Sequence, residues 1–234
     1  MRAVLLQPTY LPWMGYFGMI DSADTFVFYD DTQFVKQSWQ QRNRIRTSSG
    51  STWLVVPVTQ SFGQAINEVK ICNEVNWRPK HWKSIKYNYT KSPFFEDYAP
   101  IFEGIYKKEW ENLVDLNITL IKEITKLLGF HSEFKLSSDL NVSGTKTERV
   151  INVLNEIGAN EYISGPAAES YIELERFKKE GITLYWYEFD HPSYPQSFDG
   201  FTPQLSVLDL LFNVGNDSPN VIKEGGKNAL KKAH

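Results

Sequence analysis

Cysteine is nearly absent from this chain of 234 residues, which contains only Cys72. A single cysteine excludes an internal disulfide and any zinc site built from several thiolates, and it suits a reducing compartment. Cys72 follows a strand-like stretch at residues 69–71, a position more typical of a structural thiol than of a nucleophile. We therefore expect a cytoplasmic protein without disulfides.

Long apolar runs and an excess of basic charge are also missing. No apolar run approaches the roughly 20 residues that a membrane-spanning helix needs. Residues 1–6 are interrupted at once by Gln7 and Pro8, so we expect no secretory leader. The 25 Lys and Arg residues are scattered and face 28 Asp and Glu, for a net charge of −3. Because binding to nucleic acid requires several phosphates to be neutralised, we expect no nucleic-acid partner.

Several familiar motifs are absent as well. Neither GxGxxG nor GxxxxGK[ST] occurs, which leaves dinucleotide-binding and P-loop functions without support. The four histidines lie far apart and form no HExxH spacing, so we expect no metal site. These absences leave the cofactor unknown.

The composition that remains is that of a globular protein, with 41% hydrophobic and 23% charged residues and no linker-like tract. We expect one α/β domain over residues 1–222. Within it, the helical pattern of residues 77–129 predicts an insertion or subdomain. Residues 223–234 are expected to form a flexible tail.

Short apolar runs alternate with helical patterns on both sides of that insertion. Residues 3–6 and 25–29 predict strands around a helix at 15–23, a unit that makes the two strands parallel. A hairpin is predicted for residues 42–47 and 52–58, around Gly50. Further strands are predicted at 134–136, 161–164 and 182–189, and further helices at 145–156, 167–180 and 206–214. The predicted fold is α/β with a mostly parallel, doubly wound sheet, nucleotidylyltransferase-like or Rossmann-like, with an antiparallel hairpin and a helical insertion.

Ligands of such sheets bind outside the carboxyl ends of the strands, so the loops there carry the predicted site. After the first strand, Gln7 offers an amide, Tyr10 and Tyr16 offer hydroxyls, and Trp13 offers a flat ring. We expect this loop to hold a small substrate that is anionic or carries a sugar. The alternative is a rigid aromatic loop that only packs the following helix onto the sheet.

Adjacent carboxylates, Asp30 and Asp31, follow the second strand. They could accept a ligand hydroxyl or act as a base, while Lys36 and Arg42 could pair with an anion. Asp-Asp is also ordinary turn chemistry, and the alternating arginines of residues 42–46 could form a solvated strand face.

Other polar residues follow the later strands. His191, after the last strong strand, is the best acid-base candidate because imidazole titrates near neutral pH, although a hydrogen-bonded loop histidine is the alternative. Lys146 and Arg149 share the first turn of a helix and could bind an anion. Asp209 lies among leucines, where a carboxylate must be paired, so we expect a structural bond for it.

A combination of short motifs carries a family resemblance over residues 2–215. The motifs are Gln7-Pro-x-Tyr-x-Pro-Trp-x-Gly-Tyr16, Asp30-Asp-x-Gln-Phe34, Lys36-x-x-Trp39, Arg42-Asn43, Lys146-Thr-Glu-Arg149, Ser164-Gly-Pro-Ala-Ala168, His191-Pro-x-Tyr194-x-Gln196 and Phe201-x-Pro-x-Leu-Ser206-Val-Leu-Asp209. By these motifs the chain resembles the WbqC-like family of bacterial proteins. The resemblance implies a link to surface-polysaccharide (O-antigen) gene clusters, and with it a transfer reaction that modifies an amino sugar.

The resulting hypothesis is a transferase for an amino sugar or sugar nucleotide, with acyl or aminoacyl transfer as the reaction. The residues expected to bind the substrate are Gln7, Tyr10, Trp13, Tyr16, Gln33, Lys36, Trp39, Arg42, Asn43, Lys146, Arg149, Ser164 and Tyr194; Asp30, Asp31 and His191 are expected to move the proton. One alternative is a binding protein for sugars or nucleotides that catalyses nothing. Others are a nucleotidyl-transfer enzyme without the usual histidines in its first loop, or an assembly subunit for polysaccharide-pathway enzymes.

Overall fold

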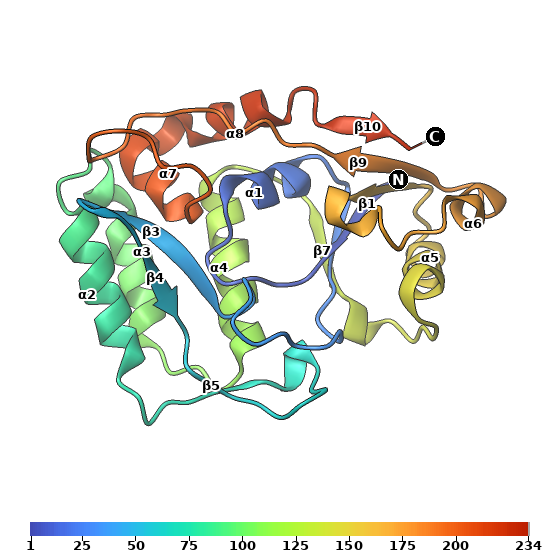
Figure 1. Ribbon diagram of the computed structural model, residues 1–234, viewed down its shortest axis with the longest axis horizontal. Helices are drawn as coiled ribbons and strands as arrows, with labels where there is room; N and C mark the ends of the chain where they lie inside the picture. Colours follow the sequence, from blue (N-terminus) through green and yellow to red (C-terminus); the bar gives the residue numbers. More distant parts are fainter. Residues whose placement is uncertain (234) are drawn as a thin grey trace.

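A six-stranded sheet forms the centre of the protein, as the computed structural model of residues 1–233 shows (Figure 1). The strand order is β10-β9-β8-β1-β2-β7, and only β10 runs antiparallel to its neighbour. The strands are β1 (Arg2–Leu6), β2 (Thr25–Phe28), β7 (Glu133–Leu136), β8 (Glu161–Ser164), β9 (Thr183–Tyr187) and β10 (Leu230–Lys232). The predicted α/β class with a mostly parallel sheet is therefore confirmed.

Both faces of this sheet are covered, which explains why its strands are continuous apolar runs. In β1, Val4 belongs to a large core shared with α1 (Met14–Asp21), α4 (Leu113–Leu127), α7 (Val207–Val214) and α8 (Ser218–Gly226). Its neighbours Ala3 and Leu5 belong to a second core, shared with α5 (Lys146–Glu156) and α6 (Leu174–Lys179). Successive side chains of a strand point to opposite faces, so helices lie on both sides of the sheet.

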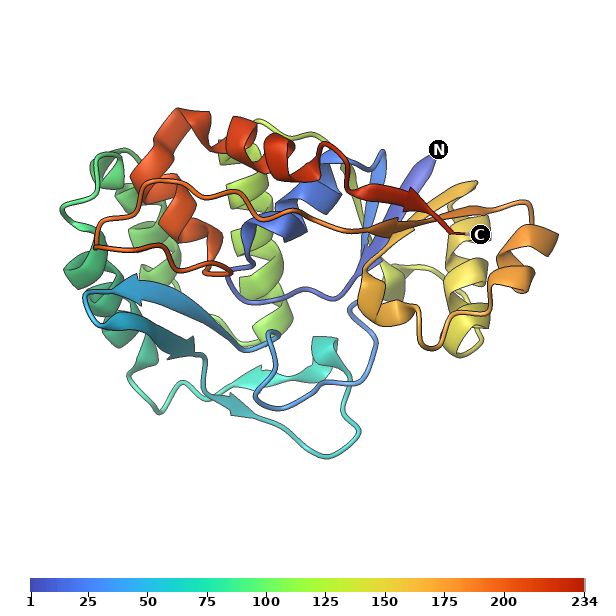
Figure 2. The same ribbon diagram turned by 45° about the horizontal axis from the view of Figure 1, so that its top comes forward.

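The long segment between β2 and β7 carries the antiparallel hairpin and the helical block. It contains β3 (Arg42–Thr47), β4 (Gly50–Val55), β5 (Val58–Thr59), β6 (Lys70–Ile71), α2 (Trp77–Tyr89), α3 (Phe95–Lys107) and α4. In Figures 1 and 2, α2 and α3 lie at one end of the molecule and α5 and α6 at the other. Phe102 of α3 contacts Phe212 of α7 at a ring distance of 5.8 Å, so the larger core extends into the helical block. Over residues 1–233, no helix combines the length and the apolar character needed to cross a membrane.

Two parts of the chain differ from the predicted elements. The helix predicted for residues 167–180 is split into a short 3-10 turn at Pro166–Ala168 and α6. Thr147 of α5 holds the break, because its hydroxyl donates to the Tyr171 carbonyl (3.3 Å) and accepts from the Glu173 amide (3.2 Å).

Residues 223–234 were expected to form a flexible tail, but the structure, which describes them as far as residue 233, has a helix end and a strand there. Residues 223–226 complete α8, and Leu230 pairs with Tyr187 as β10 adds to the sheet. Because lysines surround them, Ala229 and Leu230 were not recognised from the sequence as positions of the core. Ala229 is buried, and Leu230 packs against the larger core.

Candidate functional site

A cavity of about 670 Å³ opens where β1, β8 and β9 end. The chain proceeds from β1 to β2 on one side, whereas β8 and β9 lie on the other, so the direction of strand order reverses next to β1. In open α/β sheets, such a reversal leaves a crevice at the carboxyl ends of the strands. The cavity is lined by Leu6, Gln7, Thr9, Pro12, Trp13, Tyr16, Met19, Trp39, Asn43, Gly165, Pro166, Tyr187, Glu188, Phe189, Asp190 and Gln204.

Trp13 forms a flat wall of this cavity. Its indole contacts Phe189 edge to face at 5.3 Å and lies nearly parallel to the His191 ring at 6.0 Å. The ring also lies over Gly15, where an added Cβ would come within 2.4 Å of the indole carbons. The spacing Trp-x-Gly is thus explained, because only glycine leaves room for the ring in this position.

The segment before α7 is fastened next to this wall. Trp13 forms an antiparallel bridge with Ser206, and the Val207 amide donates to the Pro12 carbonyl at 2.9 Å. The Ser206 amide in turn donates to the Arg44 carbonyl of β3 at 2.9 Å. One short segment therefore joins the first loop, the hairpin and α7 at the mouth of the cavity.

Gln7 lies in the lining, but its amide is held by the protein. Its Nε2 donates to the Thr32 hydroxyl (2.8 Å), and its Oε1 accepts from Nε2 of Gln40 (2.8 Å). The Tyr16 hydroxyl, whose pKa is raised by burial, donates to the Gln7 backbone carbonyl (3.1 Å). These hydrogen bonds hold Gln7 and Tyr16 in fixed positions in the lining of the cavity.

Asn43 supports the cavity in the same way. Its Nδ2 donates to the Leu11 carbonyl at 2.6 Å, and its Oδ1 accepts from the Arg44 amide at 2.8 Å. This pairing supports a loop in which Leu11 adopts a positive φ of 45°.

His191 lies behind the Trp13 wall, with both ring nitrogens in hydrogen bonds. The Pro192 carbonyl can only accept, so Nδ1 donates to it (3.0 Å), and Nε2 accepts from the Gln204 amide (3.0 Å). These partners select the neutral Nδ1–H tautomer, and burial lowers the pKa of the ring. For a substrate to use His191 as a base, the bond to Gln204 must first open.

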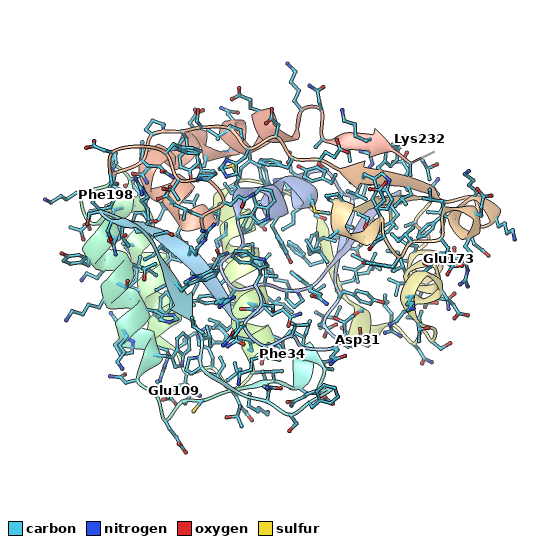
Figure 3. All side chains as sticks on the ribbon, in the orientation of Figure 1. Asp31, Phe34, Glu109, Glu173, Phe198 and Lys232 are labelled. Atoms are coloured by element: carbon cyan, nitrogen blue, oxygen red, sulfur yellow. The ribbon has the colours of Figure 1, made fainter. Side chains whose placement is uncertain are left out.

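Asp30 and Asp31 form a separate cluster outside the cavity lining, beside the turn that follows β7. Figure 3 labels Asp31. Asp30 is buried, and it accepts from the Ser137 hydroxyl (3.0 Å), the Ser138 amide (3.0 Å) and the Ser138 hydroxyl (2.7 Å). Asp31 forms an ion pair with Arg149 of α5. The two carboxylates thus tie β2, β7 and α5 together.

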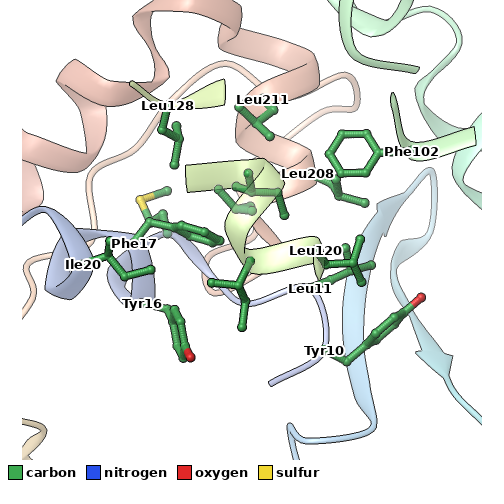
Figure 4. Close-up of a cluster of buried hydrophobic side chains, with 14 of the residues drawn as sticks. Tyr10, Leu11, Tyr16, Phe17, Ile20, Phe102, Leu120, Leu128, Leu208 and Leu211 are labelled. Carbon is green, nitrogen blue, oxygen red and sulfur yellow. The ribbon is translucent and has the colours of Figure 1, made fainter. Parts of the chain in front are cut away.

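Tyr10 is in the core rather than in the cavity lining. Figure 4 shows that the hydroxyls of Tyr10, in the loop, and Tyr16, in α1, point in different directions. The Tyr10 hydroxyl lies 2.9 Å from Nδ1 of His81 and contacts the hydroxyl of Tyr106. Complete burial raises the pKa of Tyr10.

Tyr194 also points into a buried cluster. Its hydroxyl donates to Asp209 at 2.9 Å, as do the Tyr89 hydroxyl at 2.9 Å and Nε2 of Gln196 at 2.7 Å. The expected structural pairing of Asp209 is confirmed. Burial raises the pKa of this carboxyl group.

The remaining predicted residues divide into two groups. Trp39 lies in the lining and is about half exposed, whereas Arg42 lies over the ring of Trp53, 4.3 Å from its centroid. The others are outside the lining: Gln33, Lys36 and Lys146 are exposed, Arg149 pairs with Asp31, and Ser164 is buried one residue before the lining turn.

Sequence reasoning missed the wall that follows β9. Glu188, Phe189, Asp190 and Gln204 all line the cavity. Because the apolar run at residues 182–189 predicted a strand to its very end, the last residues of that run were assigned to the sheet, although β9 ends at Tyr187. Ligands of such sheets bind at the carboxyl ends of the strands, and this rule could have identified the residues that follow β9.

Comparisons with known proteins place the chain among relatives whose role is not defined. The model of the WbqC-like protein family matches residues 7–221. A similar protein is the uncharacterized protein Rv1507c of Mycobacterium tuberculosis (strain ATCC 25618 / H37Rv), which is 38% identical over 226 residues, covering 95% of this chain and 97% of the relative. No solved structure matches the chain.

Proposed function

This chain belongs to the WbqC-like protein family, and we propose that it is a transferase that binds an amino sugar in the cavity at the ends of β1, β8 and β9. The observation that carries the proposal is the chemistry of the lining, which combines aromatic walls with carboxylates. Trp13, Tyr16, Trp39 and Phe189 supply ring surfaces, and Glu188 and Asp190 supply acidic groups.

Aromatic rings suit a sugar because the apolar C–H face of a pyranose packs against them, while its hydroxyls need polar partners. Between residues 1 and 233, no lysine or arginine is among the residues that line the cavity, and no ion pair holds Glu188 or Asp190. A cationic amine is therefore favoured over an anion inside the cavity, and an amino sugar combines this amine with the ring.

In acyl or aminoacyl transfer, the bound ammonium group first loses a proton, and the free amine then attacks the carbonyl carbon of the donor. The new C–N bond replaces the bond between that carbon and the donor's leaving group, which departs with the bonding electron pair, and the nitrogen loses a second proton. Within the proposal, Glu188 or Asp190 accepts a proton, because both residues belong to the lining. The sequence predicts Asp30, Asp31 and His191 for the role of proton acceptor. The hydrogen bonds that these side chains form within the protein must be broken before they can act in it. Substitution of each of the five by its amide or by glutamine, followed by assay of turnover, separates the two sets.

The first experiment measures binding by calorimetry with glucosamine, galactosamine and their N-acetyl forms. We expect the free amines to bind more tightly than the N-acetyl forms, and Trp13→Leu to weaken binding about tenfold through loss of ring contact. Tyr87→Leu is the matched control, because Tyr87 is 86% exposed on α2 and outside the lining. Equal binding of the amines and the N-acetyl forms, or none, contradicts the proposal.

A second candidate is a sugar-binding protein without catalysis. It is favoured by the hydrogen bonds that occupy Asp30 and His191. Binding of a sugar that is never converted, in the presence of acyl and aminoacyl donors, would support this candidate over the transferase.

The wider setting of this activity belongs to the same proposal. We place it in bacterial surface-polysaccharide biosynthesis, in the cytoplasm, with pathway enzymes as partners. The sheet order, with its reversal beside β1, supports a nucleotidylyltransferase-like or Rossmann-like relationship. Co-purification with polysaccharide enzymes tests the partners.

A further inference from the structure

A group of aromatic and basic side chains lies beside the cavity. Trp39, which lines the cavity, packs on Trp53 of β4 at a ring distance of 5.5 Å. Trp39 is 49% exposed and Trp53 is 43% exposed. The two rings are tilted by 39° to each other, so each presents its own exposed face, which a planar ligand can cover.

Two guanidinium groups lie on the same ring. Arg42 and Arg44 alternate along β3 and share one strand face, and their guanidinium carbons lie 4.3 Å and 5.7 Å from the centroid of Trp53. Arg44 also approaches the Gln204 carbonyl at 3.5 Å, and Gln204 lines the cavity. The two cations are therefore next to the opening.

Neither cation is neutralised by the protein. Within residues 1–233, no carboxylate forms an ion pair with Arg42 or Arg44, and the buried Nε of Arg44 has no hydrogen-bond partner. The third arginine of the strand differs, because Arg46 donates to the carbonyls of Gly50 (2.9 Å) and Asp199 (2.6 Å). Two adjacent positive charges repel each other, and an anion between them would remove this repulsion.

The charges of the cavity lining and of the adjacent hairpin are of opposite sign. Glu188 and Asp190 are exposed residues of the lining, whereas Arg42 and Arg44 lie beside Trp53, outside the lining. A ligand that contacts both carries a neutral or cationic ring for the cavity, together with an anionic group for the arginines and a planar group for the tryptophans. A nucleoside-diphosphate sugar combines these three parts.

We propose that Arg42, Arg44 and the Trp39–Trp53 pair form a subsite that binds the diphosphate and the base of a nucleoside-diphosphate amino sugar, with the sugar in the cavity. This inference rests on the proposed function and specifies its substrate class. Arginine suits the diphosphate because its planar fork donates two hydrogen bonds to phosphate oxygens. The tryptophan pair suits the base because stacking tolerates any of the common bases.

The experiment measures the binding of uridine diphosphate, uridine and glucosamine by calorimetry. Adenosine and guanosine diphosphates are measured as well, to cover other bases. We expect a diphosphate to bind and uridine to bind much more weakly. Arg42→Gln and Arg44→Gln should each weaken diphosphate binding roughly ten- to a hundredfold, the effect of one charge-assisted hydrogen bond. Both variants should weaken glucosamine binding far less than diphosphate binding.

The matched control is Arg176→Gln, since Arg176 lies on α6 with only an ion pair to Glu173. If Arg44→Gln unfolds the protein, Arg42→Gln together with Arg42→Lys, which keeps the charge and loses the fork, gives the same test. The inference is wrong if no nucleoside diphosphate binds, or if Arg176→Gln weakens binding as much as Arg42→Gln. If the inference is wrong, glucosamine binding can still support the proposed function. Diphosphate binding without any sugar binding would instead support the subsite and reject the proposed function.

Discussion

The buried histidine of α2 gives a quantitative prediction about stability in acid. His81 is 7% exposed, and burial lowers its pKa from 6.5 to about 4. Its Nε2 donates to the Val55 carbonyl at 3.2 Å, so Nδ1 must accept from the Tyr10 hydroxyl at 2.9 Å. Protonation would place a donor opposite a donor, in addition to placing a charge in the core.

The sign and the size follow from these two pKa values. The folded state has the lower pKa, so the unfolded state takes up the proton first as the pH falls. Stability is therefore fully present above pH 6.5 and is lost as the pH falls toward 4. At about 1.4 kcal/mol for each pH unit between these values, the loss is about 3 kcal/mol.

Urea unfolding followed by tryptophan fluorescence at several pH values from 4 to 7.5 measures this loss. His81→Gln keeps a donor and an acceptor but cannot titrate, so we expect it to be about 1 to 2 kcal/mol less stable than the wild type at pH 7.5. The difference should shrink or reverse at pH 4. His131→Gln, at an exposed position, is the matched control and should follow the wild type. Parallel pH curves for the wild type and His81→Gln would refute the reasoning.

Four further predictions concern other parts of the molecule. Gly15→Ala should weaken ligand binding by at least about fivefold in calorimetry although it removes no contact, because its Cβ would come within 2.4 Å of the Trp13 indole. Asp209→Ala should lower the free energy of urea unfolding by about 3 kcal/mol or more, since three donors lose their acceptor. The raised pKa of Asp209 favours its protonated form in the folded state, so the stability of the wild type relative to Asp209→Asn should fall as the pH rises above the ordinary pKa of 3.8. Asp30→Ala should lower the melting temperature by several degrees, because the turn at Ser137 and Ser138 loses its acceptor.

The sheet could be predicted from the sequence because its strands are buried on both faces. The apolar runs at residues 3–6 and 25–29 correspond to β1 and β2, and the position of the cavity follows from where such strands end. Gln7 and Trp13 of the first loop and Tyr16 of α1 line the cavity, and that they bind a ligand stays a prediction.

The role of each polar side chain could not be predicted in the same way. Whether Asp30 faces a ligand depends on Ser137 and Ser138, which follow a strand more than a hundred residues later. Tyr10 and Tyr16 lie close together in the sequence and both carry a phenolic hydroxyl group. Only Tyr16 lines the cavity, whereas the Tyr10 hydroxyl lies beside His81. Hydrogen bonding between distant segments decided each outcome, and a local pattern contains no information about such partners.

The short segment that joins the first loop, β3 and α7 offers a way to detect occupancy without knowing the reaction. The amides of Ser206 and Val207 are bonded to the Arg44 and Pro12 carbonyls, next to the Trp13 wall. A ligand that presses on this wall should slow the opening of these two bonds, and hydrogen–deuterium exchange would record the change. Unfractionated metabolite extracts could then be screened through two backbone positions, with no label, substrate analogue or coupled enzyme.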